Sequence, residues 1–303
     1  MRNGILGILP LVSVVALAQA PPVPPPAPPA ATQPFAQQRF MAEQAELDRL
    51  ITELKPREAL ARVEAMLPTT PEPFDKKDLK SALDSYQRNA VLVRAYSFAG
   101  KAAFAAGYWE RALEFDTKSG DVAKQNYEDS KVAFGSAAEN LRAAIAQNKQ
   151  VIDETAKDIE AIKAKANPDP GEKQQLDLVE QTKAVITSNE KWVKICEDNV
   201  EACKKTQDYY APKAAETAEW IKKEAEQLAS YKFPNNKVKY VEGIISSAKF
   251  MAQFQDKQSK IQYLYRLNVL DPDNKKVERE ISVVQGKAVP PETKPKHPGK
   301  KQG

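Results

Sequence analysis

The stretch Asn167-Pro168-Asp169-Pro170-Gly171 interrupts a region, residues 127–231, whose sequence otherwise predicts helix. Proline cannot continue a helix because its ring replaces the backbone N–H, and glycine readily takes the left-handed conformation that ends many helices. Apolar residues recur every seven positions on both sides of this stretch. A repeat of seven keeps one apolar seam facing a partner helix. The sequence therefore predicts a hairpin that folds back at residues 167–171 as an antiparallel coiled coil.

The predicted seam draws residues from both arms of the hairpin. They are Phe134, Leu141, Ile145, Asn148, Ile152 and Ile159 on the ascending arm, and Val179, Ile186, Asn189, Val193, Cys196, Val200 and Cys203 on the descending arm. The descending repeat runs on through Gln207, Ala214, Ile221 and Leu228, so we expect that arm to be one helix. Arms of about forty residues would project about 60 Å at ~1.5 Å per residue. The alternative is two independent amphipathic helices that lie on other parts of the protein.

Two polar seam residues predict the register of the arms. Asn148 lies 19 residues before Asn167, and Asn189 lies 18 residues after Gly171. A polar residue in a seam lowers stability but penalises wrong registers. We therefore expect the two asparagines to lie within one turn of each other.

Composition limits the fold class and the possible partners. Of the 303 residues, 28% are charged and 42% hydrophobic, while glycine is scarce and proline is concentrated near the ends. This argues against a sheet-rich fold, which needs many turns, and together with the periodicity predicts an all-α protein. The net charge is +4, and residues 286–303 alone hold five Lys and one Glu, which also gives +4. The rest of the chain is therefore neutral, which argues against nucleic-acid binding.

The first 34 residues predict export followed by a spacer. Residues 1–20 combine an early Arg2, an apolar run and the small-x-small end Ala18-Gln19-Ala20, as a secretory signal does. An uncleaved membrane anchor is the alternative. Residues 21–34 contain eight prolines and predict an extended linker. We expect a mature protein that begins near Pro21 and is periplasmic or secreted.

Outside the hairpin, the chain predicts shorter helices in pairs. We expect helices at 35–53, 57–67, 75–106, from 108 onward, 237–253, 257–270 and 275–284. The helix that starts at residue 108 either breaks near Gly120 or continues into the hairpin. The predicted units are 35–120 (helical repeats), 121–232 (hairpin), 233–285 (a further repeat) and 286–303 (a basic disordered tail).

Residue spacings in these pairs follow a recognisable pattern. Ala59, Val63, Met66 and Pro71 are separated by four, three and five residues, and so are Lys260, Leu264, Leu267 and Pro272; Tyr96, Gly100, Gly107 and Ala112 match the middle of the same pattern. The pairs thus resemble tetratricopeptide repeats. Lys260, Asp116 and Lys124 depart from that pattern. The alternative is the periodicity of an ordinary helical bundle.

The resemblance implies stacked helices whose concave surface binds a peptide or partner protein and performs no chemistry. Arg94, Tyr96 and Lys101 lie on the predicted helix 75–106, the first helix of the middle repeat, where they could reach such a surface. The alternative is that they have ordinary roles in the core or on a solvated face.

The two cysteines do not predict a disulfide within the chain. Cys196 and Cys203 lie seven residues apart on one predicted helix. That spacing separates them by ~10 Å along the axis, which exceeds the ~7 Å limit for a disulfide. We expect two small buried residues, with an intermolecular disulfide as the alternative.

The chain lacks the residues of common catalytic sites. His297, its one histidine, lies in the basic tail, and no glycine-rich phosphate loop precedes a helix. Asp271, Asp273 and Asn274 lack the glycine and glutamate of a calcium loop. We therefore expect no enzyme activity, metal or cofactor.

The expected function is that of an exported scaffold that binds a protein or peptide. One alternative is a structural envelope component whose basic tail contacts an anionic wall or membrane surface. Another is a periplasmic chaperone of the holdase type.

Overall fold

The computed structural model describes residues 35–230, 237–247, 253–254 and 256–288. All regular secondary structure among these residues is α-helix, with no strand, so the predicted all-α class is confirmed. The helices are α1 (Gln37–Thr52), α2 (Pro56–Glu64), α3 (Leu79–Ala105), α4 (Trp109–Lys163), α5 (Pro170–Tyr210), α6 (Lys213–Ser230), α7 (Lys237–Ser246), α9 (Lys257–Leu270) and α10 (Lys275–Val284). The predicted signal, the proline-rich linker and most of the basic tail lie outside the described residues.

The helices α1, α2 and α3 share one apolar core. Phe40 and Leu47 of α1 pack with Val63 of α2 and Leu92 of α3, and all four are buried. Helix α2 begins with Pro56 at its first turn, a position where the missing N–H costs nothing. Helix α3 begins at Leu79 rather than at residue 75 as predicted. The shift follows from Asp78, whose side chain accepts a hydrogen bond from the Ser81 backbone N–H at 2.8 Å and caps the helix.

Helix α4 is a single helix of 55 residues that passes Gly120 without a break. Of the two options that the sequence left open, the continuous helix is therefore the one observed. A Cβ at Gly120 would lie 3.4 Å from the backbone of Tyr210 and Ala211, so the glycine lets the end of α5 approach α4 closely. The predicted boundary between residues 120 and 121 falls inside this helix, which belongs to both units.

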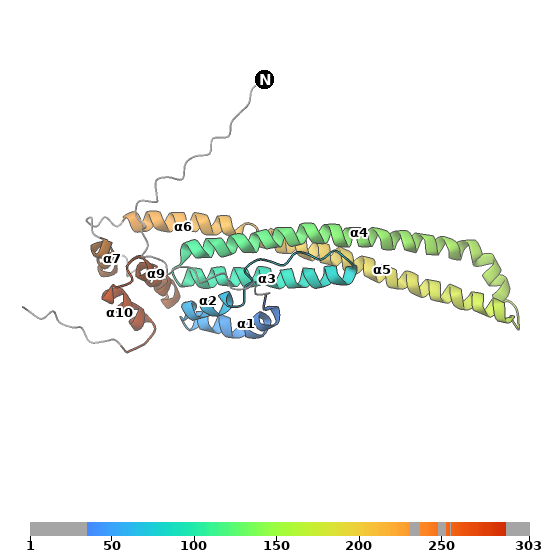
Figure 1. Ribbon diagram of the computed structural model, residues 1–303, viewed down its shortest axis with the longest axis horizontal. Coiled ribbons are helices and arrows are strands. Elements are labelled where there is room, and N and C mark those ends of the chain that lie inside the picture. Colours follow the sequence, from blue (N-terminus) through green and yellow to red (C-terminus); the bar gives the residue numbers. More distant parts are fainter. Residues whose placement is uncertain (1–34, 231–236, 248–252, 255, 289–303) are drawn as a thin grey trace, which may run out of the picture.

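The chain reverses between Lys163 and Pro170, as the quoted stretch predicts. Asp169 caps α5: its carboxylate accepts from the Glu172 backbone N–H at 2.8 Å, and the Glu172 carboxylate accepts from the Asp169 N–H at 3.0 Å. This reciprocal pair satisfies two backbone donors that a helix start leaves unpaired. Figure 1 shows α4 and α5 side by side and antiparallel along the long axis of the molecule. Helix α3 lies beside only the half of this pair that is nearer α1, α2 and α9.

The prediction of one unbroken descending arm is wrong. Helix α5 ends at Tyr210 and α6 begins at Lys213. Pro212 lies in this break because it has no N–H to donate to the carbonyl four residues earlier, and its ring crowds that carbonyl. Helix α6 packs against the first half of α4 (Figure 1). The seven-residue repeat that continued through Ala214 and Ile221 therefore does not describe one straight arm.

The C-terminal helices differ in how well the sequence predicted them. The bounds predicted for α9 and α10 are confirmed, and each begins at a capping side chain, Asp256 for α9 and Asn274 for α10. Helix α7 ends at Ser246, earlier than the predicted residue 253. Residues 248–252, in the second half of that prediction, lie outside the described residues.

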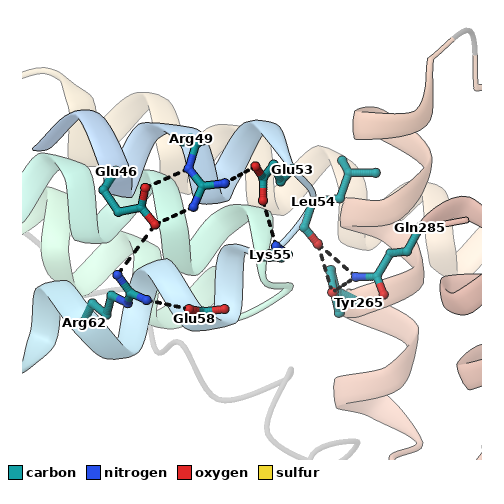
Figure 2. Close-up of polar contacts among 9 residues, drawn as sticks. All are labelled: Glu46, Arg49, Glu53, Leu54, Lys55, Glu58, Arg62, Tyr265 and Gln285. Atoms are coloured by element: carbon teal, nitrogen blue, oxygen red, sulfur yellow. Dashed lines mark hydrogen bonds and ion pairs between the residues drawn. The ribbon is translucent and has the colours of Figure 1, made fainter. Parts of the chain in front are cut away.

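Helix α9 and Gln285, the residue after α10, contact the turns of both N-terminal helix pairs. In the α1–α2 turn, the Leu54 carbonyl accepts hydrogen bonds from Gln285 Nε2 at 2.9 Å and from the Tyr265 hydroxyl at 3.4 Å (Figure 2). In the α3–α4 turn, Gly107 has φ +83°, and a Cβ there would lie 2.5 Å from the backbone of Tyr265 and Arg266. These contacts, together with the packing of α6 on α4, join α1, α2, α6, α9, α10 and the adjoining ends of α3 and α4 into a base from which the hairpin projects (Figure 1).

Candidate functional site

A groove of about 460 Å³ opens in the base where α1, α3, α4, α6 and α9 meet. Its walls come from segments that are far apart in the sequence. The side chains that give it chemical character are Lys101, Phe104, Asp116, Tyr209, Lys213, Glu216, Thr217 and Trp220. Clefts of this size that combine apolar walls with a few polar groups are typical of ligand sites.

Asp116 lies half-buried at the contact between α4 and α6. Its Oδ2 accepts a hydrogen bond of 2.6 Å from the Thr217 hydroxyl of α6. Burial raises the pKa of the Asp116 carboxyl, against the smaller lowering effects of the Thr217 hydrogen bond and of the Lys213 charge. A Cβ at Gly100 of α3 would lie 2.6 Å from Asp116 Oδ1, so glycine makes room for this carboxylate.

Aromatic rings stiffen one wall of the groove. Phe104 and Trp220, which line it, contact each other edge to face with their centroids 4.3 Å apart. Behind them the buried Trp109 meets Trp220 at 4.8 Å. Arg266 lies over the Trp109 ring at 4.7 Å and forms a two-point ion pair with Glu110 at 2.6 and 2.8 Å. Rings held on several sides give a surface that loses little entropy when a ligand binds.

The rim of the groove carries both charge signs and an exposed tyrosine. Lys213 Nζ lies 5.0 Å from the centroid of the Tyr209 ring and pairs with Glu216 at 2.8 Å. On the other side, Lys101 pairs with Asp48 at 3.2 Å. No histidine or cysteine is among the residues that line the groove. The groove offers aromatic surface for stacking and polar side chains for hydrogen bonding.

The residues predicted for the seam lie at buried or half-buried positions of α4 and α5. The buried ones are Phe134, Ile159, Ile186, Cys196 and Cys203, and the half-buried ones are Leu141, Ile145, Asn148, Ile152, Val179, Asn189, Val193 and Val200. Lys149 pairs with Glu190 at 2.9 Å. Since these residues directly follow Asn148 and Asn189, the ion pair places the two asparagines about one turn apart or less.

Both cysteines are free and buried in the base half of the hairpin. The Cys203 thiol donates to the Ser130 hydroxyl at 3.2 Å, and Asn126 Nδ2 lies 3.7 Å from its sulfur. Burial raises the pKa of both thiols. An intermolecular disulfide, the alternative considered from the sequence, would therefore require the helices to separate.

Among the surface candidates that the sequence offers, only Lys101 belongs to the groove. Of the three surface candidates, Lys101 lines it, Tyr96 is buried in the core, and Arg94 is exposed outside it. Asp116 departs from the repeat pattern, and that departure is the signal by which the sequence marks it. Lys213 and Trp220 were missed because the break at Pro212, which turns α6 toward α4, was missed.

Within the described ranges, no three His, Cys, Asp or Glu side chains gather closely enough to hold a metal ion. No helix in those ranges is both long and apolar enough to cross a membrane. Comparisons of the chain with models of protein families, with curated proteins and with solved structures find no match.

Proposed function

We propose that the chain is an exported, non-catalytic scaffold whose groove binds a peptide segment of a partner protein. The groove is the observation that carries this proposal. It combines stiff aromatic rings, an exposed Tyr209 and charges of both signs, which suit an extended peptide better than a purely apolar ligand. The hairpin would act as a spacer or as a second docking arm.

The tetratricopeptide-like interpretation of the base is part of this proposal. It is supported by the burial of the small and large residues of the pattern: Ala59 and Val63 of α2, Met66 in the turn after it, and Leu264 and Leu267 of α9. Lys260, which departs from the pattern, pairs with Glu280 at 3.5 Å at the surface between α9 and α10.

Co-purification tests the groove proposal directly. Tagged protein is isolated from its native host, and the captured proteins are identified by mass spectrometry. Partners that dock in the groove should be lost from Lys213→Glu, which reverses a charge on its rim. They should remain with Lys205→Glu, the same change on the exposed face of α5. A set of specific partners that is the same for both variants would contradict binding in the groove.

A second candidate function is that of a structural envelope component. It is favoured by the basic tail, which holds the five Lys residues after Gly286. Each Lys near an anionic surface contributes about 1 kcal/mol of binding at physiological salt. Removing residues 287–303 should therefore abolish salt-sensitive binding to anionic vesicles or cell wall. Unchanged binding would exclude this tail mechanism.

A further inference from the structure

One flank of the hairpin carries an apolar stripe that the described part of the chain leaves uncovered. On α5, Leu178, Val185 and Trp192 recur every seven residues and are 61%, 48% and 39% exposed. Ile195 of α5 and Val151 of α4 are exposed to a similar degree. A spacing of seven keeps these side chains in one row that runs alongside the hairpin seam, one position before Val179, Ile186 and Val193.

The two flanks of the hairpin differ in charge. On the opposite flank, Lys149 pairs with Glu190 and Arg142 with Glu197. Val185 lies five residues before Glu190, and that spacing turns it about 140° away around the helix axis. On α5, the positions between the apolar residues of the stripe hold Gln181 and Ser188, so this flank carries no charge there. Depletion of charge is a mark of interface cores.

Nearer the base, a helix already covers the same flank. Ala137 of α4, two heptads before Val151, packs in an apolar cluster with Phe74 and with Leu79, the first residue of α3. Helix α3 begins there, so the hairpin continues outward without a third helix among the described residues (Figure 1). The stripe thus continues an established helix-packing surface past the point where its cover ends.

We propose that a second copy of this chain covers the stripe, with two hairpins packed flank to flank and antiparallel as a four-helix bundle. A two-fold interface uses the same patch on both partners, and the α5 part of the stripe, which carries no charge, can face itself without repulsion. Val185 lies midway between Leu178 and Trp192. Antiparallel pairing therefore sets Val185 near the two-fold axis, with Leu178 opposite the partner's Trp192.

The antiparallel arrangement also places the two bases at opposite ends of the bundle. Each hairpin tip then extends toward the start of the other copy's α3, where the established cover ends. This association is independent of the proposed peptide binding, because the groove lies in the base.

Sedimentation velocity and light scattering on the purified protein test this proposal with a matched pair of variants. Val185→Glu puts a charge in the stripe. Val132→Glu makes the same change at a valine of α4 that is 53% exposed and outside the stripe. The wild type and Val132→Glu should be dimers, whereas Val185→Glu should dimerise about tenfold more weakly or worse. Unchanged circular dichroism and melting would show that both variants remain folded.

A cross-linking experiment tests the geometry. Val185→Cys near the axis should form a disulfide between copies under oxidation, and Val132→Cys should not. A wild type that is monomeric at its highest soluble concentration would overturn the proposal. So would a dimer that Val185→Glu leaves intact. A monomeric wild type that binds vesicles or a partner helix, and loses that binding in the Val185→Glu variant, would overturn the proposal in favour of that other occupant.

Discussion

Asp116 is held close to the backbone of α3 because Gly100 leaves room for its carboxylate. The same carboxylate receives the Thr217 hydroxyl, so one side chain joins three helices at the floor of the groove. At the residue scale, the groove therefore depends on a small residue on one helix and a polar one on another. In the sequence, Gly100 fits the tetratricopeptide-like spacing and Asp116 departs from it, but no local pattern shows that the two residues meet.

Two glycines of the long helices give a matched test of this close approach. Gly100→Ala should destabilise the protein by about 1–3 kcal/mol, because its Cβ would meet Asp116 Oδ1 at 2.6 Å. Gly135→Ala on α4 has no neighbour within 4 Å and should instead stabilise by about 0.5–1 kcal/mol through helix propensity. Urea unfolding measures both. Equal effects of the two substitutions would contradict the contact.

The raised pKa of Asp116 predicts a pH dependence of stability. Burial makes the folded chain bind this proton more tightly than the unfolded chain does, so protonation favours folding. The stabilisation that Asp116 gives the folded chain is present below the unfolded-state pKa of about 3.9. It is lost as pH rises through the higher folded-state pKa. Asp116→Asn, which stays neutral, should remove this fall and be more stable than wild type at neutral pH.

Thr217→Val provides the complementary test of the pH effect. It removes the hydrogen bond that favours the ionised carboxylate, so it should raise the Asp116 pKa further and extend the fall in stability to higher pH. Thermal melts across acidic and neutral pH measure both variants. Identical pH profiles for Asp116→Asn and wild type would exclude Asp116 as the group responsible.

At the element scale, caps and proline decide where helices begin and end. Asp78, Asp169, Asp256 and Asn274 each accept a backbone hydrogen bond at the start of a helix. Pro212 separates α5 from α6 in a stretch whose seven-residue spacing continues past it. Local backbone chemistry therefore overrides periodicity when the two conflict.

The capping box at the tip predicts a local effect on α5. Asp169→Ala should open the first turn of α5 more often, at a cost of about 1 kcal/mol, or about fivefold faster amide exchange in that turn. Hydrogen exchange followed by mass spectrometry of peptides near residue 172 measures it. Asp177→Ala, an exposed position inside α5, is the control and should leave that turn unchanged. Equal exchange in both variants would contradict the role of the cap.

The elements that the sequence predicts well are those whose ends are marked by their own turn or capping residues. The reversal near Pro168 and Pro170 and the bounds of α9 and α10 follow from turn and capping residues. The break at Pro212 was missed because the apolar repeat continues beyond it. The groove was not predictable, since it assembles Lys101, Asp116 and Trp220 from three helices whose packing no local pattern records.

At the scale of the whole molecule, the base and the outer hairpin use separate sets of contacts. Within the described part of the chain, the apolar core clusters contain no residue from 150 to 189. Beyond α3, the two arms pack mainly on each other. The base should therefore be stable without the outer hairpin, and the outer hairpin should be the less stable part.

Removing the outer hairpin tests this division. Lys149 and Glu190 already form an ion pair, so a short Gly-Ser linker can join them in place of residues 150–189. The shortened protein should melt cooperatively near the wild-type temperature and keep the tryptophan fluorescence of the Trp109–Trp220 contact, because the core of the base is intact. It should also lose self-association, because Leu178 and Val185 are gone. A shortened protein that unfolds would show instead that the base needs the distal arm.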